Sequence, residues 1–70
     1  MDGTRLIAIR DALGLTQAAL AKTLGVSPGY IGDIERGHRA VSLNLAVKLE
    51  TATKLPIVAE YIAAKSERAA

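Results

Sequence analysis

The stretch that decides the fold runs from Leu13 to Gly37 and has the sequence LGLTQAALAKTLGVSPGYIGDIERG. Thr16 is a residue type that caps helix N-termini, and the apolar spacing after it predicts a helix that ends at Gly25. Ser27 is a second capping residue, followed by a proline suited to a first helical position, and its helix should end near Arg36. Two short helices joined by a tight turn that contains glycine form the helix-turn-helix pattern.

The same signals divide the rest of the chain into helices. Apolar residues at helical spacing predict a first helix over about 4–13, with Gly14 as its end. Ser42 opens a fourth helix, which Pro56 must end or shortly follow, and Pro56 starts a fifth that runs to about residue 65. No segment alternates apolar and polar residues as a strand does. We therefore predict an all-α, five-helix single domain over 1–70, with the helix-turn-helix at about 16–36.

Composition excludes several classes of protein. The chain has 70 residues, no cysteine and one histidine, His38, so neither a disulfide nor a metal-ligand cluster is expected. Asp33 and Glu35 stand two residues apart on a helix and point away from each other, so they cannot share a substrate. We predict no enzyme activity, no cofactor and no small-molecule effector. No uncharged apolar stretch approaches the 18 or so residues of a membrane span, and a cytoplasmic, nucleoid-associated location is expected.

Several short motifs identify a family resemblance. The matching features are Thr16-Gln17, Leu20-Ala21, Gly25-Val26-Ser27 and Ile34-Glu35-Arg36-Gly37, with Ile9-Arg10 upstream and Ser42-Leu43 downstream. In these features the chain resembles the Cro/phage-repressor (XRE-like) helix-turn-helix family over about residues 6–62. The resemblance implies a Cro/repressor-type fold and binding to double-stranded DNA.

The predicted third helix carries the candidate contacts to bases. With its buried side marked by Ile31 and Ile34, the outward arc and its flanks supply these candidates: Ser27, Gly29, Tyr30, Gly32, Asp33 and Arg36. Such an arc enters the major groove in helix-turn-helix proteins. Asp33 can accept a hydrogen bond from cytosine N4, and Arg36 can reach guanine or a phosphate. The alternative is a solvated helix face with no ligand.

Other residues are candidates for phosphate contacts or for structural support. The phosphate candidates are Gln17, His38, Arg39 and Asn44. The resemblance implies that Gln17 bonds a phosphate and steadies the first turn of the third helix, but a proline at position 28 offers it no polar partner. The resemblance also implies that Arg10 and Glu35 form a structural pair that ties the first helix to the end of the third.

The fifth helix has more apolar surface than one small core needs. Ile57, Val58, Tyr61 and Ile62 spread over an arc of about 140°, whereas about 100° suffices for a monomer core. We interpret the excess as a homodimer contact, the alternative being an enclosed terminal helix.

Together these features predict a homodimeric transcriptional regulator that binds a two-fold DNA site. Blocking polymerase by occupancy needs no further domain, so repression of a phage or mobile-element operon is the favoured role. The alternative function is an antitoxin or protein-interaction module that neutralises a partner protein.

Overall fold

The computed structural model describes the backbone of residues 1–69 and the side chains of residues 1–65. It contains five helices, α1 (Gly3–Leu13), α2 (Gln17–Leu24), α3 (Pro28–Glu35), α4 (Leu43–Thr53) and α5 (Ile57–Ala69). No residue between 1 and 69 lies in a strand, which confirms the predicted all-α, five-helix architecture. Within the same range, no helix is both long and apolar enough to cross a membrane.

The helix ends follow the capping residues. Thr16 Oγ1 accepts a hydrogen bond from the backbone N–H of Ala19 at 3.0 Å, which caps α2 as predicted. Gly14 and Gly25 end α1 and α2 with φ angles of 68° and 71°, in the left-handed region that glycine enters without a Cβ clash. The first helix starts one residue earlier than predicted, because the Asp2 side chain caps it.

The fifth helix is longer than the sequence pattern predicted. Pro56 directly precedes it, but the helix continues past residue 65 to Ala69. Residues 66–69 are Ser, Glu, Arg and Ala, and they include good helix formers with neither glycine nor proline to end the helix.

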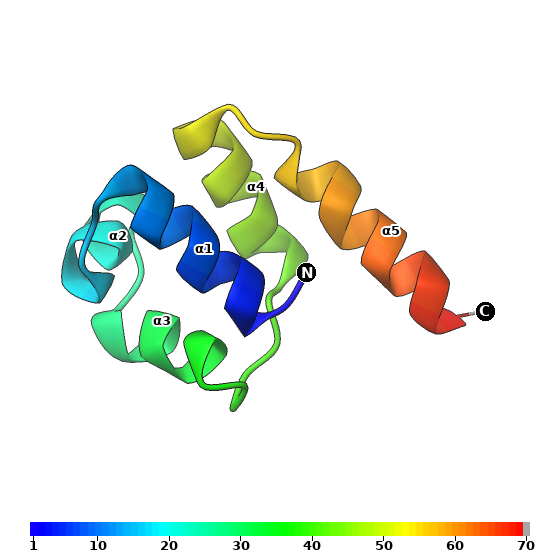
Figure 1. The fold of residues 1–70 in the computed structure, drawn as a ribbon, viewed down its shortest axis with the longest axis horizontal. Coiled ribbons are helices and arrows are strands. Elements are labelled where there is room, and N and C mark those ends of the chain that lie inside the picture. The colour runs from blue at the N-terminus through cyan, green and yellow to red at the C-terminus, as the bar shows by residue number, and fades with distance from the viewer. Residues whose placement is uncertain (70) are drawn as a thin grey trace.

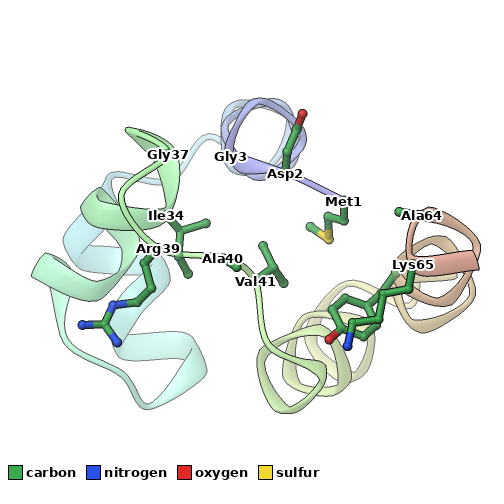
Figure 2. A pocket seen from close by; sticks show the side chains of 11 residues that line it. Met1, Asp2, Gly3, Ile34, Gly37, Arg39, Ala40, Val41, Ala64 and Lys65 are labelled. Atoms are coloured by element: carbon green, nitrogen blue, oxygen red, sulfur yellow. The ribbon is translucent and has the colours of Figure 1, made fainter. Parts of the chain in front are cut away.

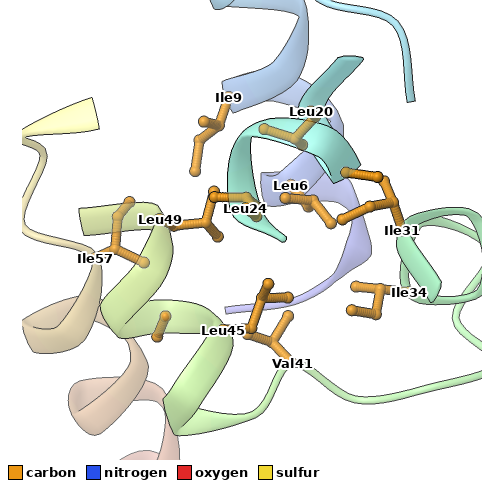
Figure 3. Close-up of a cluster of buried hydrophobic side chains, with 12 residues drawn as sticks. Leu6, Ile9, Leu20, Leu24, Ile31, Ile34, Val41, Leu45, Leu49 and Ile57 are labelled. Atoms are coloured by element: carbon orange, nitrogen blue, oxygen red, sulfur yellow. The ribbon is translucent and has the colours of Figure 1, made fainter. Parts of the chain in front are cut away.

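One contiguous core joins all five helices (Figure 3). Its largest fully buried side chains are Leu6, Ile9, Leu20, Ile31, Ile34, Leu45, Leu49 and Ile57. Among residues 1–65, every buried residue is apolar apart from Gly32. The core therefore fixes α2 and α3 against α1 and α4.

The fifth helix lies on the far side of α4 from α2 and α3 (Figure 1). Glu50 Oε1 accepts a hydrogen bond from the Val58 backbone N–H at 3.1 Å, which anchors the first turn of α5 to α4. Arg5 of α1 forms an ion pair of 2.8 Å with Glu60. Ile57 is fully buried, so its assignment as a dimer contact is wrong: this side of the helix faces the chain's own core.

A cavity of about 360 Å³ separates the later part of α5 from the rest of the molecule. Figure 2 shows the Met1 and Val41 side chains on one side of it and Ala64 and Lys65 of α5 on the other. The α5 helix therefore rests on the domain chiefly through α4.

The start of α1 packs directly on the end of α3. A Cβ atom on Gly3 would overlap the carbonyl oxygen of Ile34 and would lie 2.9 Å from that of Glu35. The backbones of the two helices meet here without an intervening side chain. This contact, which no sequence motif signalled, limits how the C-terminal end of α3 can move.

Candidate nucleic-acid interface

The turn between α2 and α3 is held by local hydrogen bonds. The Val26 backbone N–H donates to the Ala21 carbonyl at 2.9 Å, which closes the end of α2. Ser27 Oγ accepts from the Tyr30 backbone N–H at 3.1 Å and caps α3 as predicted, with Pro28 at its first turn. Only two residues, 26 and 27, lie between Gly25 and α3, so the two helices have a fixed relative orientation.

Most candidate base contacts lie on the accessible side of α3. Ser27, Gly29 and Arg36 are exposed, and Tyr30 and Asp33 are half-buried. These positions form the α3 face, the name used below for this set of five residues. Figure 1 shows α3 at the edge of the molecule, away from α5.

The structure corrects the expected placement of Gly32. Gly32 is buried rather than outward-facing. A Cβ atom there would lie 3.0 Å from Arg36 Nη1 and 3.5 Å from Gln17 Oε1, so two long side chains cover its backbone. A helical wheel gives the direction of a position but not the side chains that fold back over it. Bare backbone at Gly32 is consequently not open to a ligand in this structure.

The two charged residues of the α3 face are paired with each other. Arg36 Nη2 donates to Asp33 Oδ1 at 2.7 Å, one helical turn apart. The Arg36 side chain is 56 % exposed and that of Asp33 38 %. Both side chains are thus accessible to solvent while they are bonded to each other.

Tyr30 links α3 to the segment that follows it. Its hydroxyl lies 3.5 Å from Ser42 Oγ, and the Arg39 guanidinium lies 5.4 Å from the centre of its ring. Ser42 was predicted as a helix cap, and its contact with Tyr30 was not foreseen. Arg39 is exposed, so the cation–π contact leaves its charge accessible to solvent.

Arg10 and Glu35 form the predicted pair between α1 and α3. Arg10 Nε and Nη2 donate to the two carboxylate oxygens of Glu35 at 2.7 and 3.1 Å, and Arg10 Nη1 donates to the Leu15 carbonyl at 2.9 Å. Gln17 Nε2 also donates to Glu35 Oε1, at 2.9 Å. Gln17 therefore supports the last residue of α3 rather than its first turn, a partner that the sequence argument missed because it searched only near Pro28.

The electrostatics of this network favour the charged forms. The Arg10 hydrogen bond holds the pKa of Glu35 below its usual value, assisted by Gln17 and by the Arg10 charge and opposed by partial burial. The hydrogen bond to Glu35 likewise raises the pKa of Arg10. Only 5 % of the Glu35 side chain and 18 % of the Arg10 side chain are exposed, so the pair is largely shielded from solvent at the edge of the core.

The candidate phosphate residues lie on the elements that precede and follow α3 in the chain. Gln17 is half-buried at the start of α2, where free backbone N–H groups favour an anion. His38 and Arg39 are exposed in the segment after α3, and Asn44 is exposed in the first turn of α4.

The α4 and α5 helices carry the remaining candidates for a dimer contact. Ile62 is 54 % exposed, whereas Val58 and Tyr61 are half-buried against the core. Two side chains of α4 that the sequence argument did not single out, Leu43 and Val47, are 49 % and 46 % exposed. Their exposure depends on how α4 packs, which the apolar spacing alone does not reveal.

Among the residues that the structure describes, no group of three or more His, Cys, Asp or Glu side chains lies close enough together to hold a metal ion.

Comparison with known proteins gives consistent matches. Residues 6–59 match a protein-family model described as helix-turn-helix, a span that includes α2, the turn and α3. The uncharacterized HTH-type transcriptional regulator YazB of Bacillus subtilis is 41 % identical over 61 residues, which cover 87 % of this chain and 86 % of YazB. The HTH-type transcriptional regulator PrpR of Mycobacterium tuberculosis is 32 % identical over 66 residues, only 13 % of its length.

The fold has a close counterpart among solved structures. The crystal structure of the restriction-modification controller protein C.AhdI from Aeromonas hydrophila superposes with a TM-score of 0.72. The two chains are 44 % identical, and the match covers 79 % of this chain and 80 % of that one.

Proposed function

We propose that this chain, which belongs to the Cro/phage-repressor (XRE-like) helix-turn-helix family of DNA-binding regulators, is a homodimeric repressor that recognises a two-fold DNA site through the α3 face. The observation that carries this proposal is how α3 is attached to the neighbouring helices. Its last residue, Glu35, is bonded to Arg10 of α1 and Gln17 of α2, while its accessible side presents Ser27 and Arg36. A helix whose C-terminal end is bonded to α1 and α2 and whose outer side is exposed can insert into the major groove.

The surrounding polar residues fit the backbone of the same duplex. Arg39 and His38 follow α3, Asn44 opens α4, and Gln17 opens α2, and we assign these residues to contacts with phosphates. Phosphate contacts of this kind set orientation and affinity, and the α3 face supplies sequence preference. The formal net charge of only +2 means that local placement matters more here than overall charge.

Exposed apolar side chains support a homodimer. Leu43 and Val47 on α4 and Ile62 on α5 each expose about half of their surface, and a second copy that covers them would add to a thin core. A second copy that covers these side chains would place two α3 helices on one duplex, with half-sites about 34–36 Å apart. Cytoplasmic location with the nucleoid follows from this role.

The regulated genes have two candidates. The first is an operon of a phage or mobile element, which the family resemblance favours. The second is the control of a restriction-modification operon, which the 44 % identity to the controller protein C.AhdI favours. In both cases an operator that overlaps a promoter allows repression by occupancy alone.

Selection of bound sequences from random duplex DNA tests the proposal. The expected result is a two-fold consensus occupied by two protein chains, as measured by analytical ultracentrifugation of the complex. Recovery of no consensus, together with a stable complex between this chain and the product of an adjacent gene, would instead support the antitoxin function. The position of the consensus in the source genome distinguishes the two candidate operons.

A further inference from the structure

Two residues border the Arg36 guanidinium on the α3 face. On one side its Nη2 donates to Asp33 Oδ1 at 2.7 Å. On the other, its Nη1 lies 3.0 Å from the point that a Cβ on Gly32 would occupy. A Cβ at residue 32 would therefore press on the guanidinium, which would have to shift by a few tenths of an ångström.

The Gly32 site is also connected to the interior of the domain. Gln17 Oε1 lies 3.5 Å from the same point, and Gln17 Nε2 donates to Glu35, which is itself held by Arg10. The hydrogen bond to Glu35 therefore fixes the orientation of the Gln17 side chain, and its Oε1 atom lies beside the Gly32 position. Hydrogen bonds thus run from Arg10 of α1 through Glu35 to Gln17, which lies beside the Gly32 position.

We infer that Asp33 and Gly32 are positioning residues for Arg36, and that Arg36 makes the principal contact with a guanine base edge in the proposed DNA complex. This inference rests on the proposed function. It changes the role expected for Asp33, which serves Arg36 rather than accepting a hydrogen bond from cytosine.

The chemistry of the pair is compatible with this role. A guanidinium has five N–H donors, and the Asp33 bond uses one of them. Enough donors remain for a bidentate contact with guanine O6 and N7. An exposed ion pair adds little to the stability of the domain, so its value here lies in removing rotamer freedom from Arg36 before DNA binds.

The sign of the Asp33 effect separates positioning from simple electrostatics. A carboxylate that faces phosphates repels them, so neutralising it should strengthen binding to every duplex. A positioning carboxylate behaves differently, because its removal releases Arg36 and weakens binding to the preferred sequence only. Asp11→Asn serves as a control for the loss of one negative charge, since the Asp11 side chain lies on α1, is 69 % exposed and makes only a long ion pair of 4.0 Å with Arg10.

A double-mutant cycle on DNA binding provides the test. Fluorescence anisotropy would measure the affinities of wild type, Asp33→Asn, Arg36→Ala and the double variant for the selected duplex and for a scrambled one. In Arg36→Ala, the ratio of the affinity for the selected duplex to that for the scrambled duplex should fall roughly 5- to 150-fold, the range for one bidentate base contact. Asp33→Asn should reproduce a part of that loss, and should cause no loss in the Arg36→Ala background. Gly32→Ala should follow the same pattern.

The melting temperature of Gly32→Ala shows whether a change in its DNA binding comes from unfolding. The atoms that an alanine at 32 would meet belong to the ends of long side chains, and alanine favours helix, so Gly32→Ala should melt at or above the wild-type temperature. A loss of preference in this variant then reports on Arg36 and not on unfolding. ¹⁵N relaxation of the Arg36 Nε–Hε group in the free protein gives an independent readout, and Asp33→Asn should lower its order parameter.

Two results would overturn the inference while leaving the proposed function intact. The first is an equal loss from Asp33→Asn with and without Arg36, which means that Asp33 contacts DNA itself. The second is a gain on both duplexes similar to that of Asp11→Asn, which means that Asp33 only repels phosphates. A wild-type protein that prefers no sequence would refute the proposed function and the inference together.

Discussion

Substitution of Gly3 by alanine should destabilise the domain, although alanine is the better helix former. The new Cβ would overlap the Ile34 carbonyl oxygen and would lie 3.0 Å from Glu35 Cα and 2.9 Å from the Glu35 carbonyl oxygen. All three neighbours are backbone atoms at the buried end of α3, so none can turn aside as a side chain would.

The cost can be worked out from the two ways of relieving the overlap. If α1 moves away from α3, the penalty is that of overpacking, about 1–3 kcal/mol. If the first turn of α1 unwinds instead, the Asp2 cap is lost, at about 0.5–2 kcal/mol. Either route removes a large part of the roughly 3–5 kcal/mol that a core of this size supplies. For a domain of this length each kcal/mol lowers the melting temperature by roughly 4–8 °C.

Thermal unfolding followed by circular dichroism measures the effect, with Gly29→Ala as the matched control. Gly29 also lies in the first turn of a helix, but no atom lies within 4 Å of its added Cβ. The control should melt at or above the wild-type temperature, because alanine favours helix by up to about 1 kcal/mol. A Gly3→Ala protein that melts as high as the control would refute the close contact between α1 and α3.

Three further predictions concern the interface, the dimer and the pH dependence of stability. If Gln17 and Arg39 contact phosphates, alanine at either position should weaken binding to all duplexes alike. Titrations at several salt concentrations should show a salt slope lower by about one for Arg39→Ala and an unchanged slope for Gln17→Ala, because the glutamine amide is neutral; an unchanged slope for Arg39→Ala would contradict its assignment. Ile62→Lys should give a folded monomer by sedimentation because Ile62 is 54 % exposed, whereas Ile57→Lys should unfold the chain, and a folded Ile62→Lys dimer would place the interface elsewhere. The pKa of the Glu35 carboxyl is lowered from 4.5, so its contribution to stability is complete above that pH and is lost as the pH falls through the lower native pKa. Urea denaturation at several pH values should show that the free energy of unfolding falls less steeply with acid in Glu35→Gln than in the wild type. An unchanged pH profile would contradict this.

Most of the fold was predictable because local residues determine the helix ends. Thr16 and Ser27 cap their helices, and Gly14 and Gly25 adopt the left-handed conformation that ends a helix. Lys54 adopts the same conformation with a φ of 64°, yet a lysine gives no sequence signal for it. The end of α5 was also missed, since no residue near position 65 forces a helix to stop.

The site was less predictable because it depends on tertiary contacts. Helical spacing put Gly32 on the outward arc, but the Arg36 and Gln17 side chains fold over it. The same spacing could not say which edge of α5 faces the core, and Ile57 proved to be buried. The Arg10–Glu35 pair was foreseen only through the family resemblance, since 25 residues separate the two along the chain.

Preference for one DNA sequence over others tests the central claim most directly. The measurement compares the affinity of the wild-type protein for its selected duplex with that for a duplex of equal length and composition in which the half-sites are scrambled, at physiological salt. A regulator that uses the α3 face should prefer the selected duplex by roughly 10³-fold or more. Equal affinity for the two duplexes, or no binding to either, would contradict the account.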